Sequence, residues 1–301
     1  MTTTSPFTLT AVERDLLPTD DEVEQYARQG WYLSRKLFSD EEIDALVAAS
    51  DQFYDGHRDR RLPVRPPNLA YWEPSHGPVQ RHHDYVHYES DAIAAILRKP
   101  LVGAVAARLA RAGQIRVFQA TMIYKPPNKG EVTNLVPWHA DRHYWQTCTS
   151  DRMLTAFIPF HDCDVEMGTI TMIDGSHLWK EIPGDDSTRH FAQRDRDELD
   201  QLLHATAEFN RCEVTAIPMV IPKGHMSFHH CRIYHGSGHN RASVPRRAIS
   251  LHLQDGDNQW RPYDKPDGTR VVYNHDVLVR ATADGSPDYA DPDYCPVLWQ
   301  S

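Results

Sequence analysis

The sequence lacks the long apolar runs and the paired cysteines that characterise several classes of protein. No stretch approaches the roughly 20 apolar residues that a membrane-spanning helix requires. The N-terminal segment has no basic start followed by an apolar run, as a secretory signal would. The five cysteines are odd in number and include no CxxC pair, which argues against a disulfide framework and against a zinc knuckle. We therefore expect a cytoplasmic protein with reduced thiols and no membrane association.

Positive charge is also scarce. The chain has 32 Lys and Arg residues against 42 Asp and Glu residues, a formal net charge of -10 and a pI near 5.9. This balance provides no broad basic surface for a phosphate backbone, so we do not expect nucleic acid as a partner. The 301 residues, of which 40% are hydrophobic, suffice to bury a core, and we expect one domain over residues 1–301.

The N-terminal third is predicted to be mainly helical after a short tail. Residues 1–19 are expected to form the tail, and residues 20–114 the helical part. In residues 20–29 the apolar side chains have helical spacing, and Gly30 is a plausible stop. Residues 52–90 are rich in Pro, Arg, His and Tyr without a clear period, so we expect them to be irregular.

Two further helices have recognisable sequence signals. Ser39 is followed three residues later by Glu42, which makes a capping box at the start of one helix. The Ala- and Leu-rich segment from Asp91 to about Ala112 predicts the other, with Pro100 as an interruption.

Residues 115–255 are predicted to be rich in β-structure. Short runs of β-forming residues are separated by Gly, Pro, Asn and Asp. The runs are IRVFQATMIYK, LTAFIPFHDC, GTITMIDG, EVTAIPMVIP, HMSFHHCRIYH and RRAISLHLQD. Strands without long intervening helices indicate an antiparallel sandwich or barrel, so the fold is expected to be mainly β with flanking α-helices. Residues 179–211 are expected to be a partly helical insertion beside the cavity, and residues 256–301 a cover for one end of the barrel.

Acid residues two positions after a histidine are too common here to identify a metal site alone. With 18 histidines and 42 acidic residues in 301 positions, chance gives roughly 2.5 His-x-Asp/Glu matches. Four occur: His57/Asp59, His82/Asp84, His87/Glu89 and His139/Asp141. The first three lie in the irregular N-terminal third, where polar side chains are typical of a solvated surface. His139/Asp141 instead opens the β-rich half, and residues i and i+2 of a strand point to the same side.

The third ligand is selected by its sequence neighbours. The candidates are His225, His229, His230, His235 and His239. His235 leads into Gly236-Ser237-Gly238, a sequence suited to a tight turn, which would place its imidazole at a strand end near a cavity. Two imidazoles and one carboxylate form the set that holds ferrous iron on one face and leaves the opposite positions open. An iron-dependent oxygenase is therefore the leading hypothesis.

A basic pair follows 11 residues after His235. Residues Arg246, Ala248, Ser250 and His252 alternate with Arg247 and three aliphatic residues, so Arg246 is expected to face the cavity. A guanidinium in that position can hold a carboxylate through two charge-assisted hydrogen bonds. An isolated Arg-Arg pair would more often lie on the surface.

The combination of WHAD at 138–141, DGSH at 174–177 and HGSGHNRASVPRRAISLH from His235 resembles the phytanoyl-CoA dioxygenase family of Fe(II)/2-oxoglutarate-dependent oxygenases. The resemblance implies a double-stranded β-helix, a jelly-roll of the cupin-like kind. It also implies Fe(II) bound by His139, Asp141 and His235, and 2-oxoglutarate bound by Arg246.

Five further residues are expected in the site. The resemblance implies that Ser237 and Gln119 contact the co-substrate and that Trp145 faces the substrate. Tyr144 and Arg142 are candidates for substrate contact because they lie close to Asp141 in the sequence. The chain departs from the family pattern at Met167, Asp174 and His225, which affects loop packing and not the proposed iron ligands.

The expected function is hydroxylation of an unactivated C–H bond in a small-molecule metabolite or natural-product intermediate, with Fe(II), 2-oxoglutarate and dioxygen. Asp141 argues against halogenation, since related halogenases have a small residue at that position. Desaturation, epimerisation and ring formation use the same iron ligands and stay open. Two alternatives of another class are a non-oxidative cupin-like metal protein and a zinc hydrolase. Arg246 favours the oxygenase, and no general base for hydrolysis is identifiable.

Overall fold

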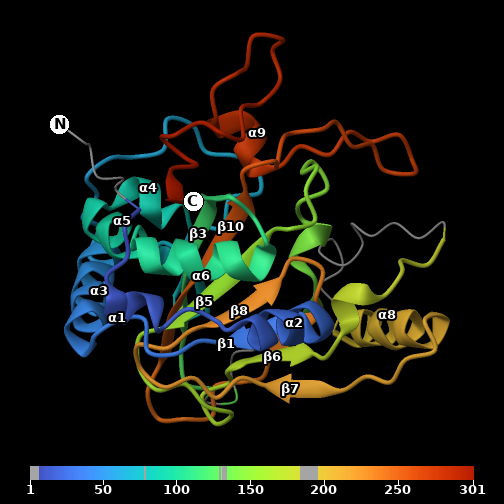
Figure 1. Cartoon of the computed structure of the whole chain (residues 1–301), viewed down its shortest axis with the longest axis horizontal. Helices are drawn as coiled ribbons and strands as arrows, with labels where there is room; N and C mark the ends of the chain where they lie inside the picture. Colours follow the sequence, from blue (N-terminus) through green and yellow to red (C-terminus); the bar gives the residue numbers. More distant parts are fainter. Residues whose placement is uncertain (1–6, 78, 129, 131–133, 184–195) are drawn as a thin grey trace.

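The core of the protein is a pair of antiparallel β-sheets, as the sequence predicts (Figure 1). The computed structural model describes residues 7–301 except 78, 129, 131–133 and 184–195. The larger sheet has the order β1-β8-β5-β10-β3-β11, and β2 pairs with the other half of β3. Its strands are β1 (Trp31–Leu33), β2 (Arg81–Asp84), β3 (Gln114–Lys125), β5 (Leu154–Pro159), β8 (Ser227–His230), β10 (Arg246–Asp255) and β11 (Val297–Gln300).

The smaller sheet has the order β4-β9-β6-β7. Its strands are β4 (Val136–His139), β6 (Ile170–Ile173), β7 (Ala216–Pro218) and β9 (His235–Ser237). His139 at the end of β4 lies opposite His235 at the start of β9. The pairing of these two short strands therefore places two histidines that are 96 positions apart in the sequence side by side.

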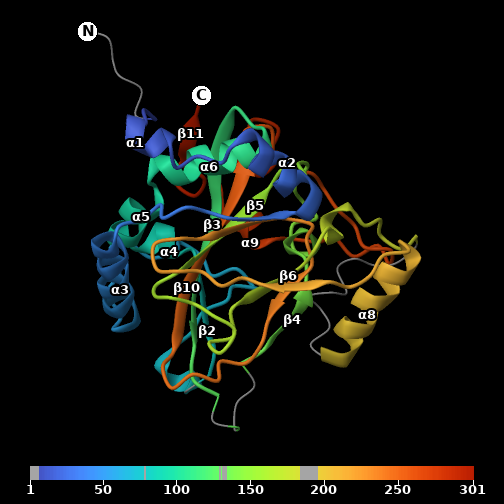
Figure 2. The ribbon, with the colours of Figure 1, turned by 60° about the horizontal axis from the view of Figure 1, so that its bottom comes forward.

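The helices gather mainly on the face of the larger sheet that is turned away from the smaller one (Figures 1 and 2). Ile249, Leu251 and Leu253 of β10 belong to the apolar core on that face, together with side chains of α3, α5 and α6. Burial of one such aliphatic side chain contributes about 1.5–3 kcal/mol. The α-helices are α1 (Ala11–Arg14), α2 (Asp20–Gln29), α3 (Asp40–Tyr54), α4 (Val86–Glu89), α5 (Asp91–Leu97), α6 (Pro100–Ala110), α8 (Arg196–Phe209) and α9 (Asn274–Leu278). The described residues also include the short 3-10 helices η1 (Pro74–His76), η2 (Asp141–His143) and η3 (Ser176–Leu178).

Most of the predicted helix boundaries are confirmed. Ser39 and Glu42 form the capping box of α3, and Gly30 ends α2 with a φ of 81°, a left-handed conformation that favours glycine. Pro100 separates α5 from α6 and occupies the first turn of α6, where its missing N–H costs nothing.

Two expectations for the N-terminal third are wrong. Residues 7–19 are not a free tail, because they include α1 and because Leu9 is buried in the core. Residues 52–90 are not irregular throughout, since they contain β2 and α4. Both segments obtain their order from packing against distant parts of the chain, and a local sequence pattern does not record such contacts.

The two segments expected around the cavity differ in what they do. Residues 271–274 of the C-terminal segment line the cavity. The described part of 179–211 does not line it, because α8 packs through Leu203 and Ala207 against Ile173 of β6 and Tyr234, which precedes β9. Residues 184–195 of that insertion lie outside the described residues.

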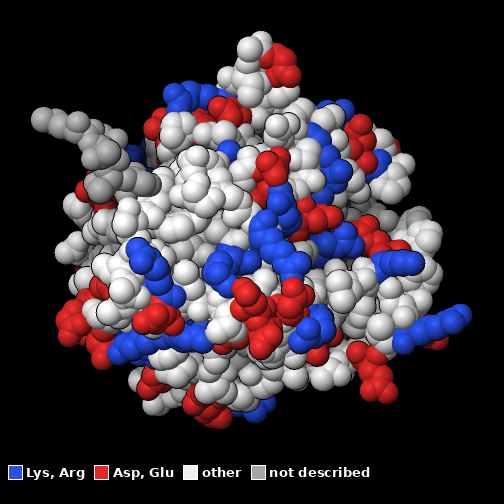
Figure 3. All heavy atoms as spheres, in the orientation of Figure 1, with Lys and Arg blue, Asp and Glu red and all other residues white. Residues whose placement is uncertain are grey.

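The surface shows no large region of a single charge on the face drawn in Figure 3, where basic and acidic side chains alternate. Among the described helices, none is long and apolar enough to cross a membrane.

Candidate metal centre and its cavity

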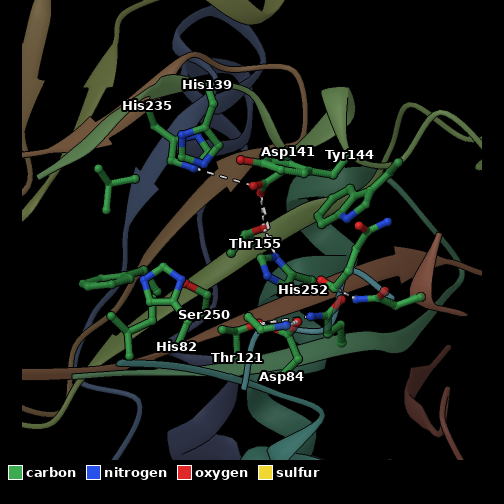
Figure 4. Close-up of a pocket in the computed structure, with 18 of the residues that line it drawn as sticks. His82, Asp84, Thr121, His139, Asp141, Tyr144, Thr155, His235, Ser250 and His252 are labelled. Carbon is green, nitrogen blue, oxygen red and sulfur yellow. Dashed lines mark hydrogen bonds and ion pairs between the residues drawn. The ribbon is translucent and has the colours of Figure 1, made fainter. Parts of the chain in front are cut away.

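His139, Asp141 and His235 come together at one end of a cavity between the two sheets (Figure 4). Each offers one ligand atom, and these atoms all lie within 4.8 Å of one another. His139 ends β4 and Asp141 begins η2, with the extended residue Ala140 between them. The predicted convergence therefore occurs, although a strand end followed by a helical turn produces it, and not a continuous strand.

The two imidazoles present the same nitrogen to the centre. His139 Nδ1 lies 2.9 Å from the carbonyl oxygen of Pro137, and His235 Nδ1 lies 3.1 Å from that of Ile233. A carbonyl can only accept, so both Nδ1 atoms carry the proton and both Nε2 atoms keep a free lone pair. Burial lowers the pKa of both histidines, which keeps them in the neutral form that binds metals.

Asp141 completes the set as an ionised carboxylate. Burial alone would raise the pKa of Asp141, but the nearby imidazoles of His235, His229 and His252 hold it well below its usual range. The hydroxyl of Thr155 donates to Oδ2 at 2.6 Å, and Oδ1 lies 3.6 Å from His235 Nε2. Oδ1 is thus directed at the centre, while Oδ2 is held by its surroundings.

This donor set fits a ferrous ion. Two neutral imidazole nitrogens and one carboxylate oxygen, each oriented by a second hydrogen bond, are the ligands of the non-haem Fe(II) oxygenases. His229 also lies close, with Nε2 3.3 Å from Asp141 Oδ2. It contacts the carboxylate oxygen that faces away from the centre.

The cavity has a volume of about 610 Å³ and extends from the metal ligands along the inner face of the larger sheet. Arg246, Ser250 and His252 of β10 line it, whereas Arg247 points to the other face and pairs with Asp51. The alternation of β10 is thus as the sequence predicts. A space of this size is typical of a pocket for small molecules.

Two buried basic side chains lie close together, and one of them, Arg246, lines an end of this cavity. Lys125 and Arg246 face each other in the register of β3 and β10. The Arg246 guanidinium donates from Nη1 to the carbonyl of Gly168, and its buried Nε has no hydrogen-bond partner among the described residues. Lys125 Nζ donates to the Ser237 hydroxyl at 2.6 Å. Burial and the charge of Arg246 lower the pKa of Lys125 to about 6.

These groups fit a dicarboxylate. A buried guanidinium with an unsatisfied N–H is costly unless an anion joins it, and an anion there would also stabilise the charged form of Lys125. A carboxylate of 2-oxoglutarate would supply the missing acceptor, with Ser237 as a further donor. Lys125 was not predicted from the sequence as a site residue. Lys125 and Gln119 nevertheless point to the same face of β3, because they are an even number of positions apart.

Gln119, Trp145 and Tyr144 also line the cavity. Gln119 accepts a hydrogen bond from the Tyr273 hydroxyl and donates to Thr121 Oγ1 at 3.2 Å. Trp145 is 2% exposed, and its indole N–H donates to the Tyr273 hydroxyl at 3.3 Å. All three side chains are therefore accessible from the cavity.

Two details of the predicted site are corrected. Arg142 does not line the cavity, because its guanidinium donates to the carbonyls of Trp145 and Cys148 and so stabilises the turn after Asp141. Gly236 does not turn the chain, because it lies within β9. A Cβ there would approach the carbonyl oxygen of Val136 to 2.8 Å, so glycine allows β9 to pack closely on β4.

His82 and Asp84 were assigned to a solvated surface, and this assignment is also wrong. Both lie on β2 and line the cavity at the side away from His139 and His235 (Figure 4). Their i, i+2 spacing is the same signal that identifies His139 and Asp141. What the sequence does not record is the pairing of β2 with β3, which places the pair inside.

Comparison with known proteins gives one family. The profile described as phytanoyl-CoA dioxygenase (PhyH) matches residues 26–248. The bovine peroxisomal phytanoyl-CoA dioxygenase is 27% identical over 141 residues, which are 47% of this chain but only 40% of the bovine protein. An ectoine dioxygenase of Bordetella parapertussis is 27% identical over 247 residues, covering 80% of this chain and 77% of the relative.

Among solved structures, the non-haem α-ketoglutarate-dependent epimerase SnoN from nogalamycin biosynthesis is similar over nearly the whole chain. The TM-score is 0.66 at 22% sequence identity, and the match covers 96% of this chain and 98% of SnoN. At that identity the likeness shows the fold alone. The predicted double-stranded β-helix is thereby confirmed.

Proposed function

The chain belongs to the phytanoyl-CoA dioxygenase (PhyH) family of non-haem Fe/2-oxoglutarate oxygenases, and from this premise we propose that it oxidises a C–H bond of a small organic molecule. The observation that supports this proposal most strongly is the combination of two centres in one cavity. One offers two free imidazole nitrogens and a carboxylate oxygen, and the other offers a buried guanidinium with an unsatisfied N–H. Iron alone needs the first centre, whereas a dicarboxylate co-substrate needs both.

Each group then has a role. His139, Asp141 and His235 would hold iron, which when bound supplies the coupling between oxidative decarboxylation of 2-oxoglutarate by dioxygen and oxidation of the substrate. Arg246 and Lys125 would bind the distal carboxylate of 2-oxoglutarate, with Ser237 as a further donor. Thr155 keeps Asp141 Oδ2 occupied, so that Oδ1 stays directed at the metal.

The substrate is proposed to be a metabolite or natural-product intermediate, and hydroxylation the outcome. Gln119, Trp145 and Tyr144 would contact it or the co-substrate, because they line the cavity between the metal ligands and the loops at its rim. Desaturation, epimerisation and ring formation require the same protein groups. Arg246 disfavours a zinc hydrolase or a non-oxidative cupin-like protein, since neither needs a buried cation to hold a second carboxylate.

Succinate release tests the proposal. Purified protein with Fe(II), 2-oxoglutarate and air should release succinate above the amount found without iron, and Asp141→Ala should abolish this release because it removes a metal ligand. Asp151→Ala is the matched control, since Asp151 is an exposed carboxylate that pairs with Arg142 and Arg232 outside the cavity. Undiminished succinate release by Asp141→Ala would refute the assignment. A screen of metabolites with mass spectrometry of the products then separates a gain of oxygen from a loss of hydrogen.

A further inference from the structure

Asp84 is a buried carboxylate at the side of the cavity opposite His139 and His235 (Figure 4). It ends β2 and is 7% exposed. Its Oδ1 accepts a hydrogen bond from the Thr121 hydroxyl at 2.7 Å, and its Oδ2 accepts one from the backbone N–H of Ala70 at 3.0 Å. Both of these donors are neutral.

The lack of any nearby arginine or histidine distinguishes Asp84 from the other buried carboxylates in the described part of the chain. Each of the others has an arginine or a histidine within 4.0 Å, whereas Asp84 has no cationic side chain at that distance among the described residues. The pairs are Glu89 with Arg58, Asp141 with His229 and His235, Asp255 with Arg152, and Asp291 with Arg280. A buried charge without a partner is costly, so a site that keeps one open to a cavity is suited to a cationic ligand.

The electrostatics of Asp84 agree with this interpretation. Burial raises its pKa to about 6, and the hydrogen bonds from Thr121, Ala70 and Gln119 oppose the shift only in part. At neutral pH the carboxylate is mostly ionised and stabilised less than it would be in water. A cation bound beside it would remove this deficit.

A purely structural role does not require a carboxylate here. Asp84 does fasten the loop that carries Ala70, since the two residues also exchange a backbone hydrogen bond from the Asp84 N–H to the Ala70 carbonyl at 2.9 Å. A neutral asparagine would still accept one side-chain hydrogen bond and would bury no charge. The negative charge therefore exceeds what the loop needs.

The surroundings of Asp84 favour an organic ammonium group. Thr121 connects Asp84 to Gln119, and Gln119 connects to the Tyr273 hydroxyl, which in turn accepts from Trp145. A carboxylate near aromatic side chains in one cavity is a combination that binds ammonium groups through charge pairing and cation–π contact. Lys125, which lies opposite Arg246 at the end proposed for 2-oxoglutarate, is four residues further along β3 than Thr121, about 13 Å away.

We propose that Asp84 binds a protonated amino group of the substrate, so that the molecule oxidised by this protein is an amine. This inference rests on the proposed function for the presence of a substrate, but it specifies the substrate's charge independently. The ammonium group would lie against Asp84 and Thr121, which leaves the carbon skeleton to extend along Trp145 and Tyr144 towards the metal ligands.

A binding experiment with two small probes tests the inference without any turnover. Cyclohexylammonium and cyclohexanol have the same carbon skeleton and differ in charge, and ligand-observed NMR measures the affinity of each for the intact protein. The wild type should bind the ammonium probe roughly tenfold or more tightly than the alcohol, and Asp84→Asn should remove that preference. Equal affinities, or no detectable binding of the ammonium probe at millimolar concentration, would overturn the inference even if the variant fails to fold.

Asp276→Asn is the matched control variant. Asp276 has neutral hydrogen-bond partners, the Tyr289 hydroxyl and the Tyr273 N–H, and burial raises its pKa as well, but it does not line the cavity. It should keep the preference for the ammonium probe. Loss of the preference in both variants to the same degree would contradict a specific role of Asp84.

A turnover experiment separates this inference from the proposed function. Amines and their N-acetylated, neutral counterparts are compared as stimulators of succinate release. Stimulation by amines alone, lost in Asp84→Asn and kept in Asp276→Asn, supports both proposals. Stimulation by the N-acetylated compounds to the same extent refutes the amine assignment and leaves the oxygenase intact. Absence of iron-dependent succinate release under every condition refutes the oxygenase, and the NMR comparison then decides the amine site alone.

Discussion

Replacing Arg246 should weaken the binding of 2-oxoglutarate far more than replacing its neighbour Arg247. The two arginines are adjacent in β10 but lie on opposite faces of the larger sheet. Arg246 is 2% exposed, lines the cavity and has an unsatisfied Nε, whereas Arg247 pairs with the exposed carboxylate of Asp51. Arg246→Ala removes a charge-assisted contact with the co-substrate, and Arg247→Ala removes a surface ion pair.

The size of the effect follows from the buried position. A hydrogen bond to a charged group contributes about 1.5–3 kcal/mol, and every 1.4 kcal/mol changes an equilibrium constant tenfold. Arg246→Ala should therefore raise the Kd for 2-oxoglutarate roughly 10- to 150-fold, with Lys125 retaining part of the attraction. The Asp51 pair is worth about 0–1 kcal/mol of stability, so Arg247→Ala should leave the Kd nearly unchanged.

Anaerobic titration of the Fe(II)-loaded protein with 2-oxoglutarate measures both variants directly. Circular dichroism and thermal unfolding of each variant confirm that the fold is retained before the affinities are compared. A larger increase in Kd for Arg247→Ala than for Arg246→Ala would refute the placement of the co-substrate.

Three other predictions concern the surroundings of the site. Because the pKa of Lys125 is lowered to about 6, this lysine is mostly neutral at pH 7.5 in the free protein, and a bound carboxylate should raise that pKa. Calorimetry in buffers of different ionisation enthalpy should therefore show proton uptake when 2-oxoglutarate binds, and the affinity for 2-oxoglutarate should fall from pH 6 to 9. Lys125→Met should abolish the proton uptake. Thr155→Val removes the hydroxyl that holds Asp141 Oδ2, so the affinity for Fe(II) should fall about 10- to 100-fold. Thr206→Val in α8 should leave the Fe(II) affinity unchanged, and equal affinities for the two variants would contradict a role of Thr155 in positioning Asp141. Gly168 has a φ of 65°, and a Cβ there would lie 2.5 Å from the Gly238 carbonyl oxygen, so Gly168→Ala should lower the free energy of unfolding by roughly 1–3 kcal/mol or more. In the same denaturant titration Gly285→Ala should lower the free energy of unfolding less, because a Cβ at Gly285 meets no neighbouring atom. An equal loss in the two variants would rule out the collision at Gly168.

The sequence predicts where the helices and strands of this protein lie along the chain better than it predicts which of them pack or pair with one another. Capping boxes, the break at Pro100 and the alternation of β10 are local signals, and the structure follows them. The candidate metal ligands could be selected from the sequence because the motif around His139 and the glycines after His235 both have local context. Family resemblance then connected two segments that no periodicity links.

The missed residues share one property. Asp84 and Lys125 depend on which strand pairs with which, since β2 lies inside only through its pairing with β3. The same His-x-Asp spacing is a surface feature at His57 and Asp59, where His57 is exposed. Single-sequence reasoning has no means to distinguish these two cases, because burial is decided by long-range pairing.

The central claim is that His139, Asp141 and His235 hold iron in the same cavity in which Arg246 holds 2-oxoglutarate. Adding Fe(II) and 2-oxoglutarate to the protein without oxygen tests it most directly, by visible absorption spectroscopy. The account predicts a weak visible charge-transfer band that saturates at one iron per chain, persists in Asp151→Ala and disappears in Asp141→Ala. No band at saturating concentrations, or an unchanged band in Asp141→Ala, would contradict it.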